Sequence, residues 1–273
     1  MIFLWIFLAA LAVAGLWLFM IAPRLRRPAL MHKLMQARYA HRGLHAISKG
    51  VPENSMLAFG LAVDAGYGIE LDVHLSKDGK LVVEHDDSLL RTCGVDRAIE
   101  DCSWDELKDL RLEGTEEKLP LLEQVLERVA GKTPLLIEGK AYRGNQAKLA
   151  AAIYKAMEGY RGDYCIESFD PRVVLWFRKN APEVVRGQLS GHLRRHGAKI
   201  NKIIDFAMRN LLVNVLSRPD FLAYDHRDHK ALSFRLCRAV FRPPVFFWTV
   251  KSVEGENLSK EKRATPIFEQ IIE

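Results

Sequence analysis

Closely spaced cysteine pairs are absent from this chain of 273 residues, as are Gly/Ser-rich linkers and internal repeats. Its four cysteines, Cys93, Cys102, Cys165 and Cys237, form no CxxC pair, which argues against a structural zinc site and against a disulfide framework. Hydrophobic residues make up 49% of the chain and charged residues 27%, which is ordinary globular usage and excludes extended disorder. The length suits one large α/β domain.

Charged and polar side chains are missing from the first 22 residues, and no Lys or Arg precedes Arg24. A helix of this length is about 33 Å long, enough to cross a hydrocarbon core of about 30 Å. A cleaved signal peptide is the alternative, but it needs a basic leading region and a shorter apolar stretch. We therefore expect a single transmembrane helix over residues 1–22, followed by a basic juxtamembrane linker over residues 23–38.

Positive charge is concentrated in two parts of the chain, which has a net charge of +6 overall. Residues 1–38 contain five Lys and Arg and no acid, and all five follow the apolar run. The positive-inside rule then places the rest of the protein in the cytoplasm, at a membrane. Residues 186–242 contain 12 Lys and Arg against 4 Asp, a net charge of +8.

Apolar residues recur at helical spacing over residues 200–216, which predicts one long helix inside the basic stretch. Two interpretations stay open for residues 200–242: packing against the rest of the domain, or contact between an apolar and basic surface and an anionic membrane. No nucleic-acid-binding motif is recognisable, so nucleic acid is not an expected partner. No sequence feature points to a protein partner.

Short apolar strands alternate with helical stretches from Tyr39 onward. We expect nine strands, over residues 39–43, 69–75, 81–85, 135–140, 164–169, 184–189, 221–224, 245–250 and 266–268. Only the turn at Asp78-Gly79 separates the second strand from the third, and so short a connection cannot join parallel strands. The third strand therefore forms an antiparallel hairpin with the second. The other eight predict an α/β fold, a (β/α)8 barrel over residues 39–273.

Carboxylates occur near the ends of two of these strands. Glu70 and Asp72 are two residues apart and share one face of their strand, although such a pair alone is more simply a half-exposed polar face. A later strand places Glu138 and Lys140 on one face in the same way. Three carboxylates at strand ends suit one hard divalent cation, Mg²⁺ or Ca²⁺.

Histidines end two of the same early strands. His41-Arg42-Gly43 closes the first strand, and the guanidinium of Arg42 has a planar fork suited to phosphate. The hairpin places His85 roughly opposite Glu70. Two histidines beside carboxylates and cations are suited to general acid and base catalysis.

The order of several short motifs resembles that of the glycerophosphodiester phosphodiesterase family across about residues 39–270. The motifs are Ala40-His41-Arg42-Gly43, Pro52-Glu53-Asn54-Ser55, Glu70-Leu71-Asp72-Val73, Lys77-Asp78-Gly79, Val83-Glu84-His85-Asp86-Asp87, Glu138-Gly139-Lys140, Ser168-Phe169 and Trp248-Thr249-Val250. Each is weak alone, but the ordered set is specific. Glu167 and Gly139 depart from the residues usual in that family.

The resemblance implies a barrel of the phosphodiesterase type that hydrolyses glycerophosphodiesters to glycerol 3-phosphate and an alcohol. It implies an acid–base pair, His41 and His85; metal ligands, Glu70, Asp72 and Glu138; phosphate-binding residues, Arg42 and Lys140; and aromatic residues at the substrate mouth, Phe169 and Trp248. One alternative is a lysophospholipase D that uses the same site on membrane lysophospholipids. Another is a catalytically inactive, membrane-bound binding module.

Overall fold

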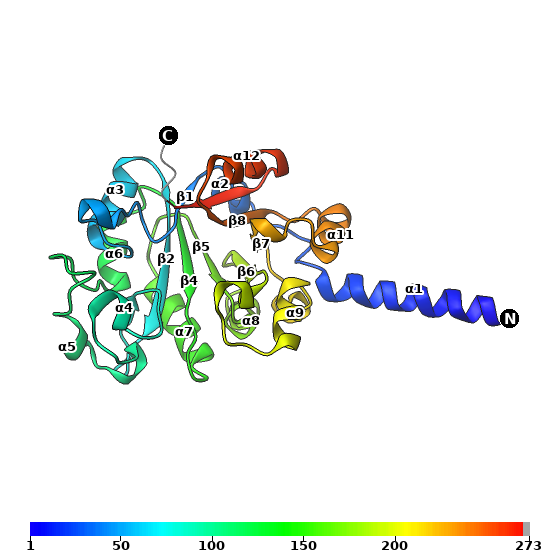
Figure 1. Ribbon diagram of the computed structural model, residues 1–273, viewed down its shortest axis with the longest axis horizontal. Coiled ribbons are helices and arrows are strands. Elements are labelled where there is room, and N and C mark those ends of the chain that lie inside the picture. Colours follow the sequence, from blue (N-terminus) through cyan, green and yellow to red (C-terminus); the bar gives the residue numbers. More distant parts are fainter. Residues whose placement is uncertain (270–273) are drawn as a thin grey trace.

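The barrel is closed by eight parallel strands in this computed structural model, which describes residues 1–269 (Figure 1). These strands are β1 (Tyr39–Ala40), β2 (Gly68–Leu75), β4 (Leu135–Gly139), β5 (Tyr164–Ser168), β6 (Arg186–Ser190), β7 (Phe221–Asp225), β8 (Val245–Val250) and β9 (Thr265–Phe268). Closure follows because β1 pairs with both β2 and β9. The remaining strand, β3 (Leu81–Val83), is antiparallel to β2, so the predicted barrel and hairpin are both confirmed.

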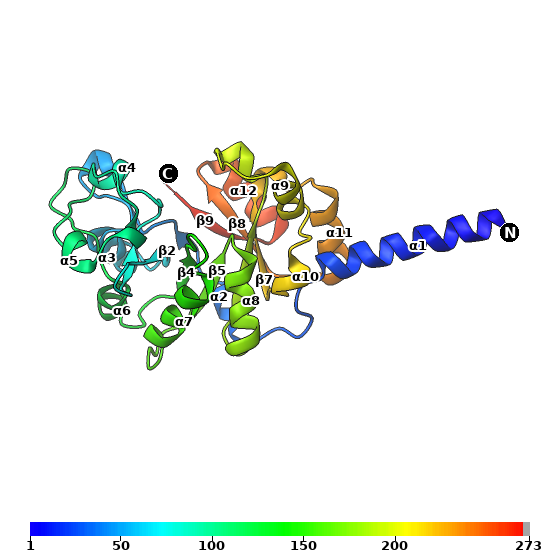
Figure 2. The same cartoon turned by 90° about the horizontal axis from the view of Figure 1, so that it is seen from below.

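Helices precede β1 and connect the later strands, and many of them cover the outside of the barrel (Figures 1 and 2). They are α1 (Ile2–Ile21), α2 (Leu30–Leu34), α3 (Met56–Asp64), α4 (Leu90–Cys93), α5 (Trp104–Leu107), α6 (Leu122–Val129), α7 (Gln146–Ala156), α8 (Pro171–Asn180), α9 (Lys202–Arg209), α10 (Asn214–Ser217), α11 (Leu232–Phe241) and α12 (Val253–Lys262). Four short 3₁₀ helices are η1 (Ile47–Lys49), η2 (Ile99–Asp101), η3 (Leu193–His196) and η4 (His226–Asp228). Local chemistry sets several boundaries: Ser55 and Ser252 cap α3 and α12, and α8 starts with Asp170-Pro171.

Two layers of side chains fill the barrel, because residues two apart on a strand point to the same side. The layer near the start of the strands is apolar and packs on Met31 and Leu34 of α2; it contains Tyr39, Leu136, Cys165, Phe221, Phe246 and Ile267. The next inward positions, nearer the strand ends, are polar and buried; among them are Asp72, Glu138, Glu167 and Gln188. This change from apolar to polar places the chemistry at the carboxyl ends of the strands, where such barrels keep their sites.

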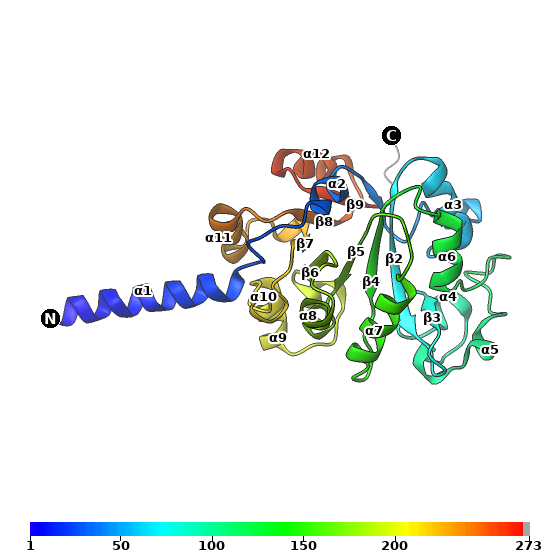
Figure 3. The ribbon, with the colours of Figure 1, turned by 180° about the vertical axis from the view of Figure 1, so that it is seen from behind.

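Residues 84–120 form an insertion after β3 with a small core of its own. That core contains Leu89, Ile99, Cys102, Leu107, Leu112 and Leu119, and it packs on Val82 of β3. In Figures 1 and 3 the insertion lies on the side of the barrel opposite α1.

The hairpin register differs by one residue from the sequence-based expectation. Val73 pairs with Val83, and the backbone N–H of Glu84 donates to the carbonyl of Asp72 at 3.1 Å. The turn joins Leu75 to Leu81, so pairing continued past β3 would bring the backbone of His85 opposite Leu71. The sequence-based expectation that His85 lies opposite Glu70 is therefore wrong.

The expected single helix over residues 200–216 is also wrong. Leu211 has a positive φ of 60° and interrupts it, so α9 and α10 are separate. Only part of the apolar stripe packs inward, since Met208 and Leu211 are buried. Ile203, Ile204 and Phe206 of α9 are instead 75%, 53% and 52% exposed.

The apolar helix α1 projects from the domain and docks only at its C-terminal end (Figures 1 and 3). Asn214 Nδ2 donates to the carbonyl of Ile21 at 2.9 Å, and Arg218 Nη1 donates to the carbonyls of Phe19 and Ala22 at 2.7 and 2.8 Å. Trp17 Nε1 donates to Ser233 Oγ at 3.1 Å. The final carbonyls of α1 are thus bound by side chains of the barrel domain.

The basic segment after α1 packs along the barrel. Arg24 pairs with buried Asp220 at 3.3 Å, and Arg27 donates to the carbonyl of Phe241 at 2.8 Å. Met31 and Leu34 are buried beneath the barrel. These contacts join residues 23–38 to the folded domain.

Candidate active site

Three buried carboxylates meet at the ends of two neighbouring strands. Glu70 and Asp72 come from β2 and Glu138 from β4, and Asp72 lies beside Glu138 in the parallel register. One oxygen from each of the three lies within 4.8 Å of the others. Their spacing in the sequence predicts this grouping, and the structure brings the three residues together.

The electrostatics of this cluster fit a bound divalent cation. Burial, and then the charges of Asp72 and Glu138, raise the pKa of Glu70 well above its ordinary value. Burial raises the pKa of Glu138 to about 7. Asp72 Oδ1 is buried and accepts no hydrogen bond of good geometry among the described residues. Oxygen ligands held close together at an electrostatic cost are a suitable set for Mg²⁺ or Ca²⁺.

Lys140 extends between two of these carboxylates. Its Nζ lies 3.1 Å from Asp72 Oδ1 and 3.0 Å from Glu138 Oε2. Burial alone would raise the pKa of Asp72, but the charges of Lys140, His85 and Arg42 hold it well below its usual range. Lys140 therefore adds a fixed positive charge beside two carboxylates of the cluster.

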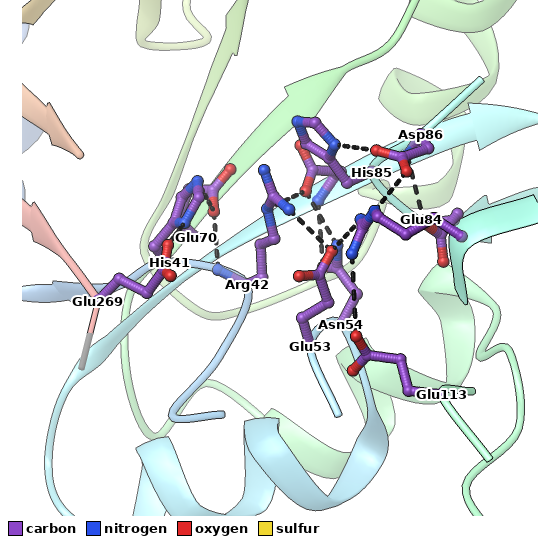
Figure 4. A network of polar contacts seen from close by, with 12 residues as sticks. His41, Arg42, Glu53, Asn54, Glu70, Glu84, His85, Asp86, Glu113 and Glu269 are labelled. Carbon is purple, nitrogen blue, oxygen red and sulfur yellow. Dashed lines mark hydrogen bonds and ion pairs between the residues drawn. The ribbon is translucent and has the colours of Figure 1, made fainter. Parts of the chain in front are cut away.

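The backbone of the His41-Arg42-Gly43 turn adopts a conformation that depends on these residues. Arg42 and Gly43 have positive φ values of 55° and 80°, and a Cβ at Gly43 would lie 2.9 Å from Ala58. This conformation lets the Arg42 N–H donate to Glu70 Oε2 at 2.9 Å. Arg42 Nη1 donates to Glu53 Oε1 at 2.7 Å, as Figure 4 shows.

The two predicted histidines lie on either side of Arg42 in Figure 4. His41 Nδ1 lies 3.0 Å from Glu269 Oε2, and its Nε2 lies 4.0 Å from Glu70 Oε2. His85 Nδ1 lies 2.6 Å from Asp86 Oδ1. In both cases a carboxylate holds one ring nitrogen and fixes the orientation of the imidazole.

Both imidazoles are biased toward the neutral form. Burial, and then the charge of Arg42, lower the pKa of His41 to about 4. Burial, and then the charge of Lys140, lower the pKa of His85. A neutral imidazole is able to accept a proton near pH 7.

Several supporting residues had no role assigned to them from the sequence. Glu53 accepts hydrogen bonds from Arg42 and from Arg91, which also holds Asp86 Oδ2 at 2.6 Å. Asn54 Nδ2 donates to Asp72 Oδ2 at 2.9 Å. Glu53, Asn54 and Asp86 stood in motifs already noted, so those motifs could have identified them, whereas Glu269 had no such signal.

The two departures from the family pattern have structural roles. Glu167 lies beside Glu138 in the parallel register, and burial, followed by the charge of Glu70, raises its pKa well above the ordinary value. Gly139 leaves room for α8, because a Cβ there would lie 3.2 Å from Val173 Cγ1. Glu167 is thus a fourth buried carboxyl group beside the cluster.

The predicted aromatic residues contact one another at the ends of β5 and β8. The rings of Phe169 and Trp248 are 5.3 Å apart and perpendicular, and the ring of His196 lies 5.0 Å from that of Trp248. His196 Nε2 lies 2.9 Å from buried Asp225 Oδ2. His226 and His229 lie in and just after η4, the short helix that directly follows Asp225 at the end of β7.

Comparison with known families gives this geometry a context. Residues 41–259 match the Glycerophosphoryl diester phosphodiesterase family. The chain belongs to this family. The matched range starts at His41 and contains the three clustered carboxylates, His85 and Lys140, so the resemblance read from the sequence is confirmed.

Individual members of the family are related to this chain over part of their length. The glycerophosphodiester phosphodiesterase of Caldanaerobacter subterraneus subsp. tengcongensis is 37% identical over 164 residues, covering 55% of this chain and 65% of that protein. The lysophospholipase D GDPD1 of Rattus norvegicus is 32% identical over 155 residues, covering 51% of this chain and 48% of that protein. The chain thus spans between about half and two thirds of these relatives.

A solved structure has the same barrel fold. The phosphodiesterase of Oleispira antarctica, in complex with its product sn-glycerol-3-phosphate, superposes with a TM-score of 0.71 at 22% identity. The match covers 88% of this chain and 94% of that one. It confirms the fold over nearly the whole domain.

Proposed function

We propose that this protein hydrolyses a glycerophosphodiester to glycerol 3-phosphate and an alcohol, with one divalent cation and two histidines. The observation that carries the proposal is the placement of His41 and His85 on either side of Arg42, next to three clustered carboxylates. Membership of the phosphodiesterase family supports it. The product bound to the Oleispira antarctica relative has the same chemistry as the product proposed for this chain.

Glu70, Asp72 and Glu138 would hold the cation, Mg²⁺ or Ca²⁺, which when bound supplies positive charge and Lewis acidity at the phosphate. Arg42 and Lys140 contribute two fixed positive charges to the same place. They bind the phosphate oxygens and stabilise the charge that grows on them as the ester bond breaks. Phe169 and Trp248 line the substrate mouth.

The histidines move the protons. One imidazole, in its neutral form, accepts a proton from the nucleophile. The other must first take up a proton, and as imidazolium it donates that proton to the departing alkoxide. The nucleophile is water or the substrate's own 2-hydroxyl group. Glu269 and Asp86 keep the free Nε2 atoms of His41 and His85 directed away from their carboxylate partners.

Lysophospholipase D activity is the second candidate, supported by the relation to the Rattus norvegicus protein and by the apolar helix α1. A catalytically inactive binding module is the third, and the complete set of carboxylates, histidines and cations disfavours it.

The placement of the domain at a membrane is part of the proposal. Helix α1 is long and apolar enough to cross a bilayer, and an apolar stretch of 18 residues within it is unburied, whereas Ile21 at its docked end is buried. Its 20 residues span about 30 Å, which equals the thickness of the hydrocarbon core. Because the last turn of α1 is docked, a full crossing brings the docking surface to the membrane interface, with the catalytic domain in the cytoplasm.

Helix α9 provides an apolar face at that docking surface. The ring of Phe206 lies 6.4 Å from that of Trp17, and Ile203 and Ile204 are exposed on the same helix. Lys199 and Lys202 flank this face. An exposed apolar face with cationic neighbours is suited to an anionic lipid surface.

The decisive experiment uses the purified full chain with and without EDTA. Glycerophosphocholine, glycerophosphoethanolamine and lysophosphatidylcholine are offered, and the products are separated by mass. Release of glycerol 3-phosphate supports the first candidate, and release of a lysophosphatidic acid with choline supports the second. If the protein converts none of these substrates with Mg²⁺ or Ca²⁺ supplied, the catalytic proposal is wrong. His85→Ala is the matched inactive control.

A further inference from the structure

A cationic pocket lies outside the barrel, between the start of α11 and the end of α12. It has a volume of about 510 Å³ and is lined by His229, Lys230, Phe234, Arg235, Arg238 and Lys262. None of these residues belongs to the carboxylate cluster or to the histidine pair. Five of the six side chains carry, or are able to carry, a positive charge, and no acidic residue within residues 1–269 lines the pocket.

The positive charge of this pocket is poorly compensated. Within residues 1–269, Lys230, Arg235 and Arg238 have no carboxylate within 4 Å, and only Lys262 has one, from Glu261 at 2.7 Å. Arg238 is half-buried, with its guanidinium 5.9 Å from the ring of Phe234. A half-buried guanidinium without a carboxylate has lost part of its hydration, which an anion would replace.

The cationic side chains of the pocket also have hydrogen-bond donors that make few contacts within residues 1–269. Arg238 Nη2 donates to the carbonyl of Lys262, and this is the one hydrogen bond that its side chain makes with the described residues. A guanidinium has five N–H donors and suits two oxygens of a phosphate. Lys230 and Arg235 are exposed at the rim of the pocket. Several donors therefore converge on one volume.

The position of α11 brings this pocket close to the docked end of α1. Ser233 and Cys237 are four residues apart on α11 and contact Trp17 and the carbonyl of Ile21. Arg238 follows Cys237 directly and so lies on the next face of the same helix. The pocket is within about one helix diameter, about 10 Å, of the anchor's last turn. Figure 1 shows α12 and α11 together on the side from which α1 leaves.

We propose that this pocket is a binding site for a phosphate group, distinct from the barrel site. The group comes either from the headgroup of an anionic phospholipid or from a soluble phosphate. The position beside α1 favours the lipid. The site retains lipid at the protein and plays no part in the chemistry at His41 and His85.

The test uses the full-length protein in a non-ionic detergent, with EDTA present so that no cation in the barrel contributes. Calorimetric titrations compare micelles containing phosphatidylglycerol, micelles containing phosphatidylcholine, and inorganic phosphate. The pocket variant is Lys230→Gln with Arg235→Gln, two exposed residues whose loss leaves the fold intact. The control is Lys148→Gln with Lys155→Gln, two exposed residues of α7, which removes the same charge away from both the pocket and the apolar face of α9. Arg238→Gln is a third variant, checked by thermal unfolding.

We expect saturable binding of phosphatidylglycerol, weakened about 10-fold to 30-fold in the pocket variant, since each cation near an anionic lipid has a substantial effect. The control should change by less than about twofold. If inorganic phosphate binds, and this binding is lost in the pocket variant, the site is supported. If phosphatidylglycerol then binds no better than inorganic phosphate, the ligand is a soluble phosphate and not a lipid headgroup. No saturable binding, or equal loss in the pocket variant and the control, overturns the proposal. Phosphodiesterase activity enters none of these readouts.

Discussion

Nδ1 of His41 lies 3.0 Å from Oε2 of Glu269, although the two residues are 228 positions apart. β1 and β9 are neighbours in the closed barrel, so their ends lie together. Burial alone would raise the pKa of Glu269, but its hydrogen bond to His41 and its contact with Lys251 hold that pKa well below its ordinary value. Glu269 is therefore an anion that orients the imidazole.

Glu269→Gln should lower kcat by about 10-fold to 100-fold, the usual cost of losing a group that orients a functional side chain. KM should change little, because Glu269 touches no proposed phosphate ligand. Steady-state kinetics with glycerophosphocholine measures both values. Exposed Glu183→Gln is the control. An unchanged kcat would show that Glu269 does not position His41 for catalysis.

Removing one metal ligand should act in opposite directions on activity and stability. Glu70→Gln should nearly abolish hydrolysis, since fewer charged oxygens would remain for the cation. In EDTA the same variant should unfold at a higher temperature than the native protein, because it removes a buried carboxyl beside Asp72 and Glu138. Asp72→Asn should also nearly abolish hydrolysis.

Thermal unfolding with Mg²⁺, with Ca²⁺ and with EDTA tests the ligand set. A cation at about 100 times its Kd should stabilise the native protein by about 2.7 kcal/mol and the Glu70→Gln variant by much less. Glu123→Gln, an exposed change on α6, should behave like the native protein. Equal stabilisation of all three proteins would contradict the proposed ligands.

The two histidines should each be needed for turnover. His41→Ala and His85→Ala should each lower the rate by about 100-fold or more. The double variant should lose much less than the product of the two losses, because residues that act as a unit are not additive. Single-turnover measurements with saturating cation check this. A single variant with native turnover would show that its histidine is structural.

Glu84 should make stability depend on pH. Burial raises the pKa of this side chain to about 7, above its ordinary 4.5. Between these two values the folded protein retains a proton that the unfolded chain has lost, so the contribution of Glu84 to stability falls as pH rises through this window. Glu84→Gln keeps an acceptor for the N–H of Asp86 and removes the titration.

The gain in free energy of unfolding from Glu84→Gln should therefore be larger at pH 7.5 than at pH 5. Denaturant unfolding of both proteins at the two pH values gives the difference directly, and effects of other groups cancel. A difference between the two proteins that does not vary with pH would mean that Glu84 titrates normally.

A fluorescent label on helix α9 should detect the proposed contact of this helix with lipid. An environment-sensitive fluorophore at Ile203→Cys should shift to shorter wavelength when the full chain enters nanodiscs, because its surroundings become less polar. Asp105→Cys, on α5 in the insertion on the far side from α1, is the matched control and should not shift. The four native cysteines are buried or half-buried, so unmodified protein gives the labelling background. Identical emission at both positions would place α9 in water.

The barrel could be predicted because its strands are short apolar runs and its hairpin has a strong turn signal. β8 was predicted at its observed bounds and β2, β4 and β7 within one residue, since each follows or precedes a clear loop. The expected single helix failed because apolar spacing continues across the break at Leu211. Periodicity alone cannot distinguish an apolar face that packs inward from one that is exposed, as on α9.

In the candidate site, too, local spacing predicted some residues and missed others. Glu70, Asp72, Glu138 and Lys140 were grouped correctly because residues two apart share a strand face, and neighbouring parallel strands end together. Glu269 and the Arg91–Asp86 contact depend on which strands and loops become neighbours after closure. Local spacing contains no such information, and the one-residue register difference at His85 arose in the same way.

Side chains of the barrel domain bind the last carbonyls of α1, so we expect the helix and the barrel to turn together. A bilayer thinner than a hydrophobic helix makes that helix tilt. Here any tilt of a membrane-spanning α1 rotates the barrel through the same angle, and with it the direction in which the mouth opens over the lipid. Membrane thickness would then set the path that a lipid substrate takes to the histidines.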